Sequence, residues 1–190
     1  SAALTGPGAY RLTRLLRGQG GSDAAIGATS AGNAVLVLDG KVESLAVSPA
    51  WLDGAVSLRS FAGVSDAEGT AISAGLSLVP VLPLQPAHLL ALRDGSGDIT
   101  LSWLRRSRAD SDAWSADDAP ADYLPERYRV TIYNGLSVVR TLEVISAATL
   151  YTAAQQSADF GAPPSAFGFT VAQLSQVFGP GPAASGAFAA

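Results

Sequence analysis

The chain has 190 residues, of which 48% are hydrophobic and only 15% are charged, with 20 glycines and 11 prolines. This composition predicts one or two globular domains rich in turns and excludes a mainly disordered chain. The net charge is −4, which argues against direct, sequence-specific nucleic-acid binding.

Apolar and polar residues alternate with a period of two along much of the chain, which predicts an all-β protein. In the first part, Asp39-Gly40 favours a type I′ turn between two apolar strands, so a hairpin is predicted over residues 34–47. Trp51 is expected in the core. Further strands of this part are expected at residues 9–16, 55–59 and 70–79. Together these elements predict a small β-domain over residues 1–82.

Three prolines fall within residues 80–86 and predict an extended hinge at the domain boundary, because proline cannot donate a ladder hydrogen bond. Residues 83–190 are predicted to form a second domain, a β-sandwich. Its strands are expected at residues 86–92, 98–103, 128–133, 136–144 and 166–173, with a weak last strand in the Ala/Gly-rich tail 183–190. Their inward side chains are expected to be Ile99, Leu101, Trp103, Tyr128, Val130, Ile132, Phe167, Phe169 and Val171. Such faces can build one sandwich core.

Four segments of this second part resemble strands of fibronectin type III domains. They are Pro86-x-x-Leu89, DITLSW at 98–103, YRVTIYNG at 128–135 and FTVAQLSQVFGPGPAAS at 169–185. Each segment is a weak signal alone, but their order and spacing fit the family. The resemblance implies a fibronectin type III-like β-sandwich, with an unusually long connection over residues 104–127 between its second and third strands.

Cysteine and methionine are both absent. Disulfides and thiolate metal ligands are therefore excluded. Because position 1 is Ser and not Met, we expect this sequence to be part of a larger protein. The longest apolar run, residues 71–84, is interrupted by two prolines and is too short to cross a membrane as a helix. Neither a membrane-spanning segment nor a cofactor is expected.

The whole chain is similar to the C-terminal end of the large tail-tip protein of gene transfer agents and related tailed phages of alphaproteobacteria. The segments that carry this resemblance are YRLTRLLRGQGGSD at 10–23, LVPVLPLQPAHL at 78–89, GDITLSWLRRSRADSDAW at 97–114, YRVTIYNG at 128–135 and ADFGAPPSAFGFTVAQLS at 158–175. The resemblance implies a homotrimer in the virion, at the tail tip or baseplate. The implied partners are distal tail and hub proteins and a receptor on the host cell surface.

The long connection holds the candidate binding residues, because loops at the end of a sandwich often carry recognition. The residues singled out are Arg105, Arg106, Arg108, Asp110, Asp112, Trp114 and Tyr123. The two aromatic side chains suit a sugar- or protein-binding patch. Packing in a subunit interface or in a small loop core is the other interpretation, and it is favoured.

Acidic residues in the turn at 94–98 and in the long connection offer oxygen ligands for calcium. They are Asp94, Asp98, Asp110, Asp112, Asp117 and Asp118. The spacing of an EF-hand is absent, and the neighbouring arginines favour solvated or ion-paired carboxylates instead. No catalytic or metal-binding residue is therefore predicted.

A hydrolase would need a serine, a histidine and an acid in one place. The nearest serine motif surrounds Ser30 and leads into a predicted strand, whereas a nucleophile elbow follows a strand and precedes a helix. The only histidine, His88, lies in the proline-rich segment. We therefore expect a structural component of a tail tip that acts in assembly, and not an enzyme. The alternative is a pair of accessory binding domains from a secreted carbohydrate-processing enzyme.

Overall fold

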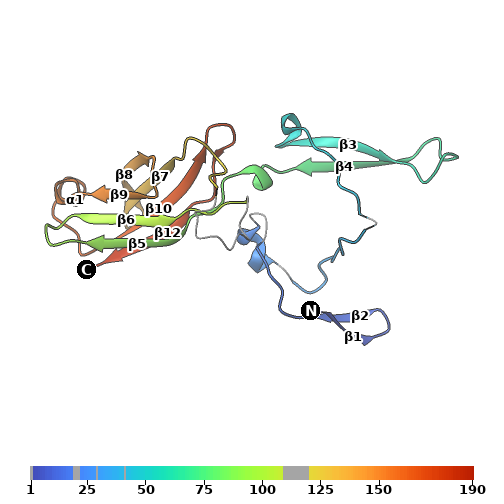
Figure 1. Cartoon of the computed structure of the whole chain (residues 1–190), viewed down its shortest axis with the longest axis horizontal. Helices are drawn as coiled ribbons and strands as arrows, with labels where there is room; N and C mark the ends of the chain where they lie inside the picture. Colours follow the sequence, from blue (N-terminus) through green and yellow to red (C-terminus); the bar gives the residue numbers. More distant parts are fainter. Residues whose placement is uncertain (1, 19–21, 29, 41, 109–119) are drawn as a thin grey trace. The chain divides into compact units, whose positions relative to one another are not determined.

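The computed structural model describes residues 2–18, 22–28, 30–40, 42–108 and 120–190. The chain divides into two compact units, Ser1–Pro80 and Val81–Ala190. Strands are the main regular element of both units (Figure 1), so the prediction of an all-β protein is confirmed. Among the described residues, no helix is both long and apolar enough to cross a membrane.

The second unit is a sandwich of two antiparallel sheets (Figure 1). One sheet has the order β5-β6-β9, from strands Ala87–Arg93, Ile99–Leu104 and Ala148–Tyr151. The other runs β8-β7-β10, from strands Ser137–Val144, Tyr128–Asn134 and Ala166–Ser175, with β11 (Gly179–Pro180) and β12 (Ala184–Ala189) on the far side of β10. Strands β5, β6 and β9 therefore face strands β7, β8, β10, β11 and β12. This arrangement is the predicted fibronectin type III-like β-sandwich.

The inward faces of the strands build the core as the alternation predicts. The nine residues expected there are all buried, with exposed fractions of 6% or less. Trp103 and Tyr128 meet edge to face across the two sheets, with ring centroids 5.1 Å apart, a geometry that aromatic pairs prefer.

The Ala/Gly-rich tail closes the sandwich as strand β12, paired with β10 from Ala166↔Ala189 to Val171↔Ala184. Phe188 in it is 4% exposed and stacks on Phe167 at 5.3 Å. Gly186 passes directly under Phe169, because a Cβ there would lie 2.7 Å from the ring. A residue without a side chain fits at position 186 because the Phe169 ring leaves no space there for a Cβ.

Three elements of the second unit were missed, the strands β9 and β11 and the helix α1 (Ala153–Phe160). Thr152 caps the helix by accepting from the backbone N–H of Gln155, and the Gln155 side chain accepts from the backbone N–H of Thr152. Gly161 ends the helix with a φ of 81°, which glycine adopts without strain. With only eight residues, α1 is too short to show a helical period in the sequence.

The first unit contains two separate hairpins. β1 (Ala2–Gly6) pairs with β2 (Ala9–Leu12), and β3 (Gly54–Ser60) pairs with β4 (Thr70–Leu76). Its 3₁₀ helices are η2 (Asp23–Ala28), η3 (Pro49–Trp51) and η4 (Val79–Val81), the last of which crosses into the second unit. The strands expected at 55–59 and 70–79 are therefore present, and the one expected at 9–16 ends at Leu12.

The predicted hairpin over residues 34–47 is wrong. A turn does form, with the Val42 N–H donating to the Asp39 carbonyl at 3.0 Å, but the described residues of both arms form no strand. Side chains from Val35 to Leu38 are between 74% and 77% exposed. A continuous apolar run of this kind forms a strand where both faces are covered, and the described residues supply no such cover.

Trp51, expected in the core, is 50% exposed, so that prediction is also wrong. Among the described residues of the first unit, none is buried. Yet the β3-β4 hairpin has a clear apolar face, in which Leu58 lies opposite Ile72. An isolated two-stranded hairpin is marginally stable in water. The first unit therefore has the strands of a β-domain without its core.

Replacing Gly186 by Val should lower the free energy of unfolding by about 1–3 kcal/mol, because the added side chain overpacks the space under Phe169. Denaturant unfolding of the full chain measures this change. Ser185→Val is the matched control, since Ser185 is exposed on the same strand. Equal stability of the two variants would contradict the close packing at Gly186.

Candidate interaction site

The long connection between β6 and β7 is described at its two ends, residues 105–108 and 120–127. Four of the residues singled out from the sequence lie there, namely Arg105, Arg106, Arg108 and Tyr123. The other three, Asp110, Asp112 and Trp114, lie outside the described residues, as do Asp117 and Asp118. The two ends form a polar cluster that starts at the edge of the sandwich core.

Glu126 joins the first end of the connection to the core. One carboxylate oxygen accepts from Arg105 at 2.7 Å, and the other accepts from the Tyr128 hydroxyl at 2.6 Å. Burial, and then the bond to Glu126, raise the pKa of Tyr128 well above its ordinary value. Tyr128 therefore remains a neutral donor, and its ring packs on Trp103 inside the sandwich.

Asp122 joins the two ends of the connection to each other. Its carboxylate accepts from the Ser107 hydroxyl at 2.6 Å and from the Arg108 backbone N–H at 2.8 Å. Ser107 is buried, and Arg106 beside it is half-buried. Bonds between neutral donors and a carboxylate are stronger than bonds between neutral groups, so the base of the loop is fixed.

Two residues of this base hold the segment that enters the sandwich. The Arg108 guanidinium donates to the Leu82 carbonyl at 2.9 Å, and the Tyr123 hydroxyl donates to the Val81 carbonyl. Burial raises the pKa of Tyr123, which keeps its hydroxyl protonated as a donor. Both contacts go to backbone oxygens that no ladder hydrogen bond uses.

Residues 81–86, named here the entry segment, also pack against the residues that lead into β12, at the same end of the sandwich. Pro83, Leu84 and Pro86 are buried. Gly181 lies on the Pro83 carbonyl so closely that a Cβ would be 2.3 Å from the oxygen, and the Gln85 amide donates to the Ala183 carbonyl at 2.7 Å. The expected hinge is therefore wrong for residues 83–86, because these prolines are core residues of the second unit.

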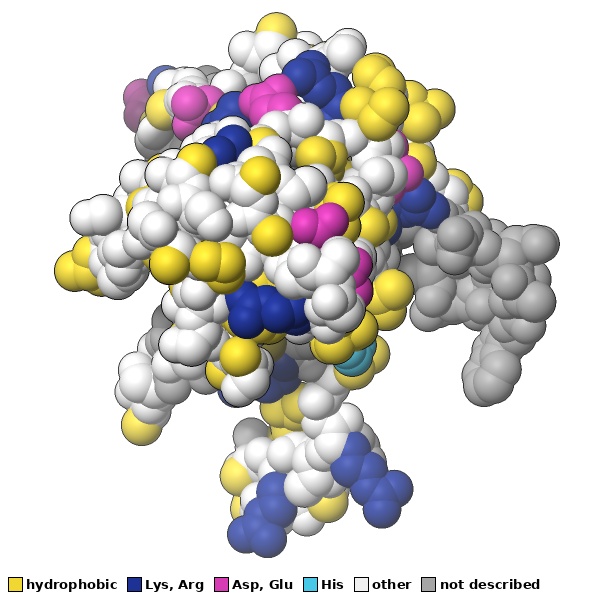
Figure 2. Space-filling view, turned by 90° about the vertical axis from the view of Figure 1, so that its left-hand side faces the viewer, with side chains coloured by type: hydrophobic (Ala, Val, Ile, Leu, Met, Phe, Trp, Pro, Cys, Tyr) yellow, Lys and Arg dark blue, Asp and Glu magenta, His cyan; other side chains and the backbone are white. Residues whose placement is uncertain are grey.

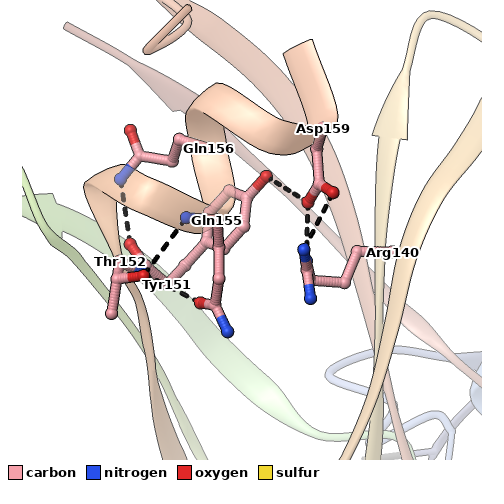
Figure 3. A network of polar contacts seen from close by, with 6 residues as sticks. All are labelled: Arg140, Tyr151, Thr152, Gln155, Gln156 and Asp159. Atoms are coloured by element: carbon pink, nitrogen blue, oxygen red, sulfur yellow. Dashed lines mark hydrogen bonds and ion pairs between the residues drawn. The ribbon is translucent and has the colours of Figure 1, made fainter. Parts of the chain in front are cut away.

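A second polar network fastens α1 to the sandwich (Figure 3). Arg140 on β8 donates two bonds to Asp159, at 2.6 and 2.9 Å, and the Tyr151 hydroxyl donates to the same carboxylate at 2.7 Å. The bond from Arg140 is the main reason that the pKa of Asp159 lies below its ordinary value. Gln156, which is fully buried, donates to the carbonyls of Gly97 and Tyr151 at 2.9 Å.

In the acidic turn at residues 94–98, the carboxylates accept hydrogen bonds from backbone N–H groups. Asp94 accepts from the N–H groups of Ser96 and Asp98, and Asp98 accepts from the Ala153 N–H at 2.7 Å. Among the described residues, no group of three or more His, Asp or Glu side chains is placed to hold a metal ion. Ser30 donates to the Asn33 side-chain oxygen at 3.2 Å, and His88 lies exposed at a bulge in β5 with a φ of 51°.

A shallow hollow lies beside the pair of strands β7 and β8, with a volume of about 180 Å³. Arg127 and Arg129 both pair with Glu143 in its wall, at 2.5 and 3.0 Å. Those bonds, first the one from Arg129, lower the pKa of Glu143. On the face drawn in Figure 2, described charges of both signs are scattered among uncharged and apolar side chains.

Comparisons with known proteins relate the start of the chain to one family. Residues 1–36 match the model of a family described as "Rcc01698-like, C-terminal". No curated protein matches the chain. The family match covers the β1-β2 hairpin and η2, which belong to the unit without a core.

Solved structures that are similar to the chain include fibronectin type III domains. Domains d3-d4 of the rat CD45 extracellular region have 13% identity and a TM-score of 0.41, covering 85% of this chain and 78% of that one. The fibronectin type III domain of human fibronectin type III domain containing protein 3 has 14% identity and a TM-score of 0.38, covering 56% and 84%. At such values the fold assignment rests on the strand order of the chain itself.

Weakening the base of the long connection should free the entry segment. Combining Arg108→Ala with Tyr123→Phe removes the donors to Leu82 and Val81. Losing about 1–2 kcal/mol of hydrogen bonding should speed amide exchange in residues 81–85 by about 5- to 30-fold, as followed by mass spectrometry. Arg129→Ala, which removes a more exposed ion pair, is the control. Equal amide exchange rates in the two variants would contradict the role of Arg108 and Tyr123 in holding the entry segment.

The Arg140–Asp159 pair should stabilise the fold in a pH-dependent way. Because the pKa of Asp159 is lowered in the folded chain, its contribution is present above the ordinary pKa near 4 and is lost as pH falls through the folded value. Asp159→Asn should therefore lower the free energy of unfolding by about 1–3 kcal/mol at pH 7, with a smaller difference below pH 4. Chemical unfolding at several pH values measures this.

Glu143→Gln is the control for that measurement, because Glu143 also pairs with arginines but is 40% exposed. Its effect at pH 7 should be smaller, since exposed ion pairs contribute little. A pH-independent effect of Asp159→Asn would show that the ion pair is not what stabilises this part of the fold.

Proposed function

We propose that this chain is a structural component of a phage-like tail tip or baseplate, the C-terminal part of a central hub protein in the virion. The chain acts in assembly of the tail tip, and the assembled tail tip attaches to the host cell or delivers DNA. It has no catalytic role in this proposal. Its partners are two further copies of the same chain and the neighbouring distal tail and hub proteins.

The observation that carries this proposal is the missing core of the first unit. Among its described residues none is buried, while Leu58 is 38% and Ile72 48% exposed on the apolar face of β3-β4. The composition is too apolar and too poorly charged for a disordered linker. Apolar strands that find no cover in their own chain find it in an assembly, where interfaces resemble a domain core cut in half.

The family relation supports the same conclusion. The residues that match the "Rcc01698-like, C-terminal" model are residues 1–36, and the resemblance to tail-tip proteins of gene transfer agents continues through the sandwich. The sandwich itself has a complete core. We infer that it folds independently of neighbours, whereas the first unit depends on them.

The proposal predicts that the apolar face of β3-β4 holds copies of the chain together. The double variant Leu58→Asp, Ile72→Asp places charge on that face, and burying an unpaired charge in an interface is costly. Trimers of the chain should therefore be lost in sedimentation velocity experiments. Leu136→Asp, at a fully exposed turn position of the sandwich, should leave the particles unchanged. A wild-type chain that stays single at every concentration would contradict the homotrimer.

Placement in a tail requires a separate experiment. Antibodies raised against this chain should label one end of the tail in electron micrographs of phage-like particles from cells that encode it. Particles without label, or label over the head, would overturn the tail-tip proposal even if the chain is trimeric.

A further inference from the structure

The hollow of about 180 Å³ lies at the end of β7, between β8 and the turn that joins β10 to β11. Glu143 on β8 lies directly opposite Arg129 on β7, and these two residues form one wall together with Arg127. The Leu174 N–H donates to the Arg127 carbonyl at 2.9 Å, which places the end of β10 and the turn after it along the other wall. The hollow is therefore built on paired strands of the unit that has its own core.

The charged wall of the hollow has one positive charge in excess. Glu143 accepts from Arg127 with one carboxylate oxygen, at 2.5 Å, and from Arg129 with the other, at 3.0 Å. Because the bonds from Arg129 and then from Arg127 lower the pKa of Glu143, its carboxylate is ionised at neutral pH. No other charged residue among those described lines the hollow, although the chain as a whole carries −4. The hollow therefore suits a group with a single negative charge.

Both arginines keep donors for such a group. Each guanidinium bonds Glu143 through its Nη2 alone, and its Nε and Nη1 have no partner among the described residues. The planar N–H groups of arginine match a carboxylate, because they can bond both of its oxygens at once. A carboxylate is therefore the group that fits these donors.

The other wall offers hydrogen-bonding groups without charge. Ser175 is 7% exposed, and its hydroxyl accepts from the N–H groups of Val177 and Phe178 at 3.2 and 3.1 Å. The hydroxyl proton itself has no acceptor among the described residues, whereas buried polar groups ordinarily have partners. The exposed amide of Gln176 beside it can both donate and accept. Such neutral groups suit the hydroxyls of a ligand.

We propose that this hollow binds a sugar acid, a single sugar ring that carries one carboxylate. The carboxylate accepts from Arg127 and Arg129. Hydroxyl groups of the ring donate to Glu143 and accept from Ser175, and its C–H groups pack on Leu174, which also lines the hollow. Pockets for drug-sized ligands have volumes of roughly 300–1,000 Å³, so a hollow of about 180 Å³ suits a ligand of one ring.

Other ligand classes use fewer of these groups. A neutral sugar leaves the excess positive charge unused. Phosphate carries more than one negative charge near neutral pH, because its second pKa is about 6, and Glu143 repels the additional charge. A nucleic acid binds along a track of basic residues, whereas this hollow has one charge in excess on a chain that carries −4.

Titration of the full chain with sodium glucuronate, followed by NMR at constant ionic strength, tests the site. Signals of residues 175–179 and of the Arg129 side chain should shift and saturate with a dissociation constant on the order of 1 mM, since a single ring binds weakly. Arg129→Gln should weaken binding by about fivefold or more, because a charge-assisted bond is lost. Arg11→Gln removes the same charge from an exposed position of β2 and should leave the affinity unchanged.

The outcomes separate a sugar acid from the other ligands. Equal affinity for glucose and glucuronate, or equal weakening by Arg129→Gln and Arg11→Gln, overturns the proposal. Inorganic phosphate that binds as tightly as glucuronate and shifts the same signals also overturns it, and assigns the hollow to anions in general. Circular dichroism establishes that both variants are folded, as expected for exposed ion pairs. The inference does not rest on the proposed function, because the experiment measures the chain alone.

Discussion

A strand in which apolar and polar side chains alternate has one apolar face, and that face needs a second layer to cover it. This requirement explains why one unit of the chain has a core and the other has none among its described residues. In the second unit each sheet covers the other, so that Leu101 and Val130 are both fully buried. In the first unit the same alternation places Leu58 and Ile72 side by side, with no buried residue among those described. One chain therefore combines a sandwich that has its own core with strands whose apolar face has no cover among the described residues.

A hairpin was predictable from the sequence where the alternation of apolar and polar residues and the turn residues indicate the same strand pairing. For β7 and β8, the alternation from Tyr128 and the Asn134-Gly135 turn specify the same hairpin, and the structure has it. Residues 34–47 failed because Asp39-Gly40 fixes only the turn, whereas strand pairing also depends on a covering layer. The helix α1 had a readable signal in Thr152 and Gln155, the two ends of a capping box, but its eight residues are too few for a period.

The candidate site was predictable in part. Arg105, Arg108 and Tyr123 were singled out because charged and aromatic side chains gather in one long loop, and the described ends of that loop do hold them in one cluster. Their contacts were not predictable, since Arg108 and Tyr123 bond to backbone carbonyls. A carbonyl is present at every residue, so nothing in the sequence distinguishes the oxygens of Leu82 and Val81.

The fastening of the entry segment determines how the second unit responds to mechanical force. A pull on the chain at Val81 loads the bonds from Arg108 and Tyr123, the Gln85 bond to Ala183 and the packing of Pro83 under Gly181, all before it reaches the ladder of β5. Because these contacts follow one another along residues 81–85, each must break before tension reaches the first ladder hydrogen bond of β5. The entry segment therefore protects the sandwich from being peeled apart strand by strand.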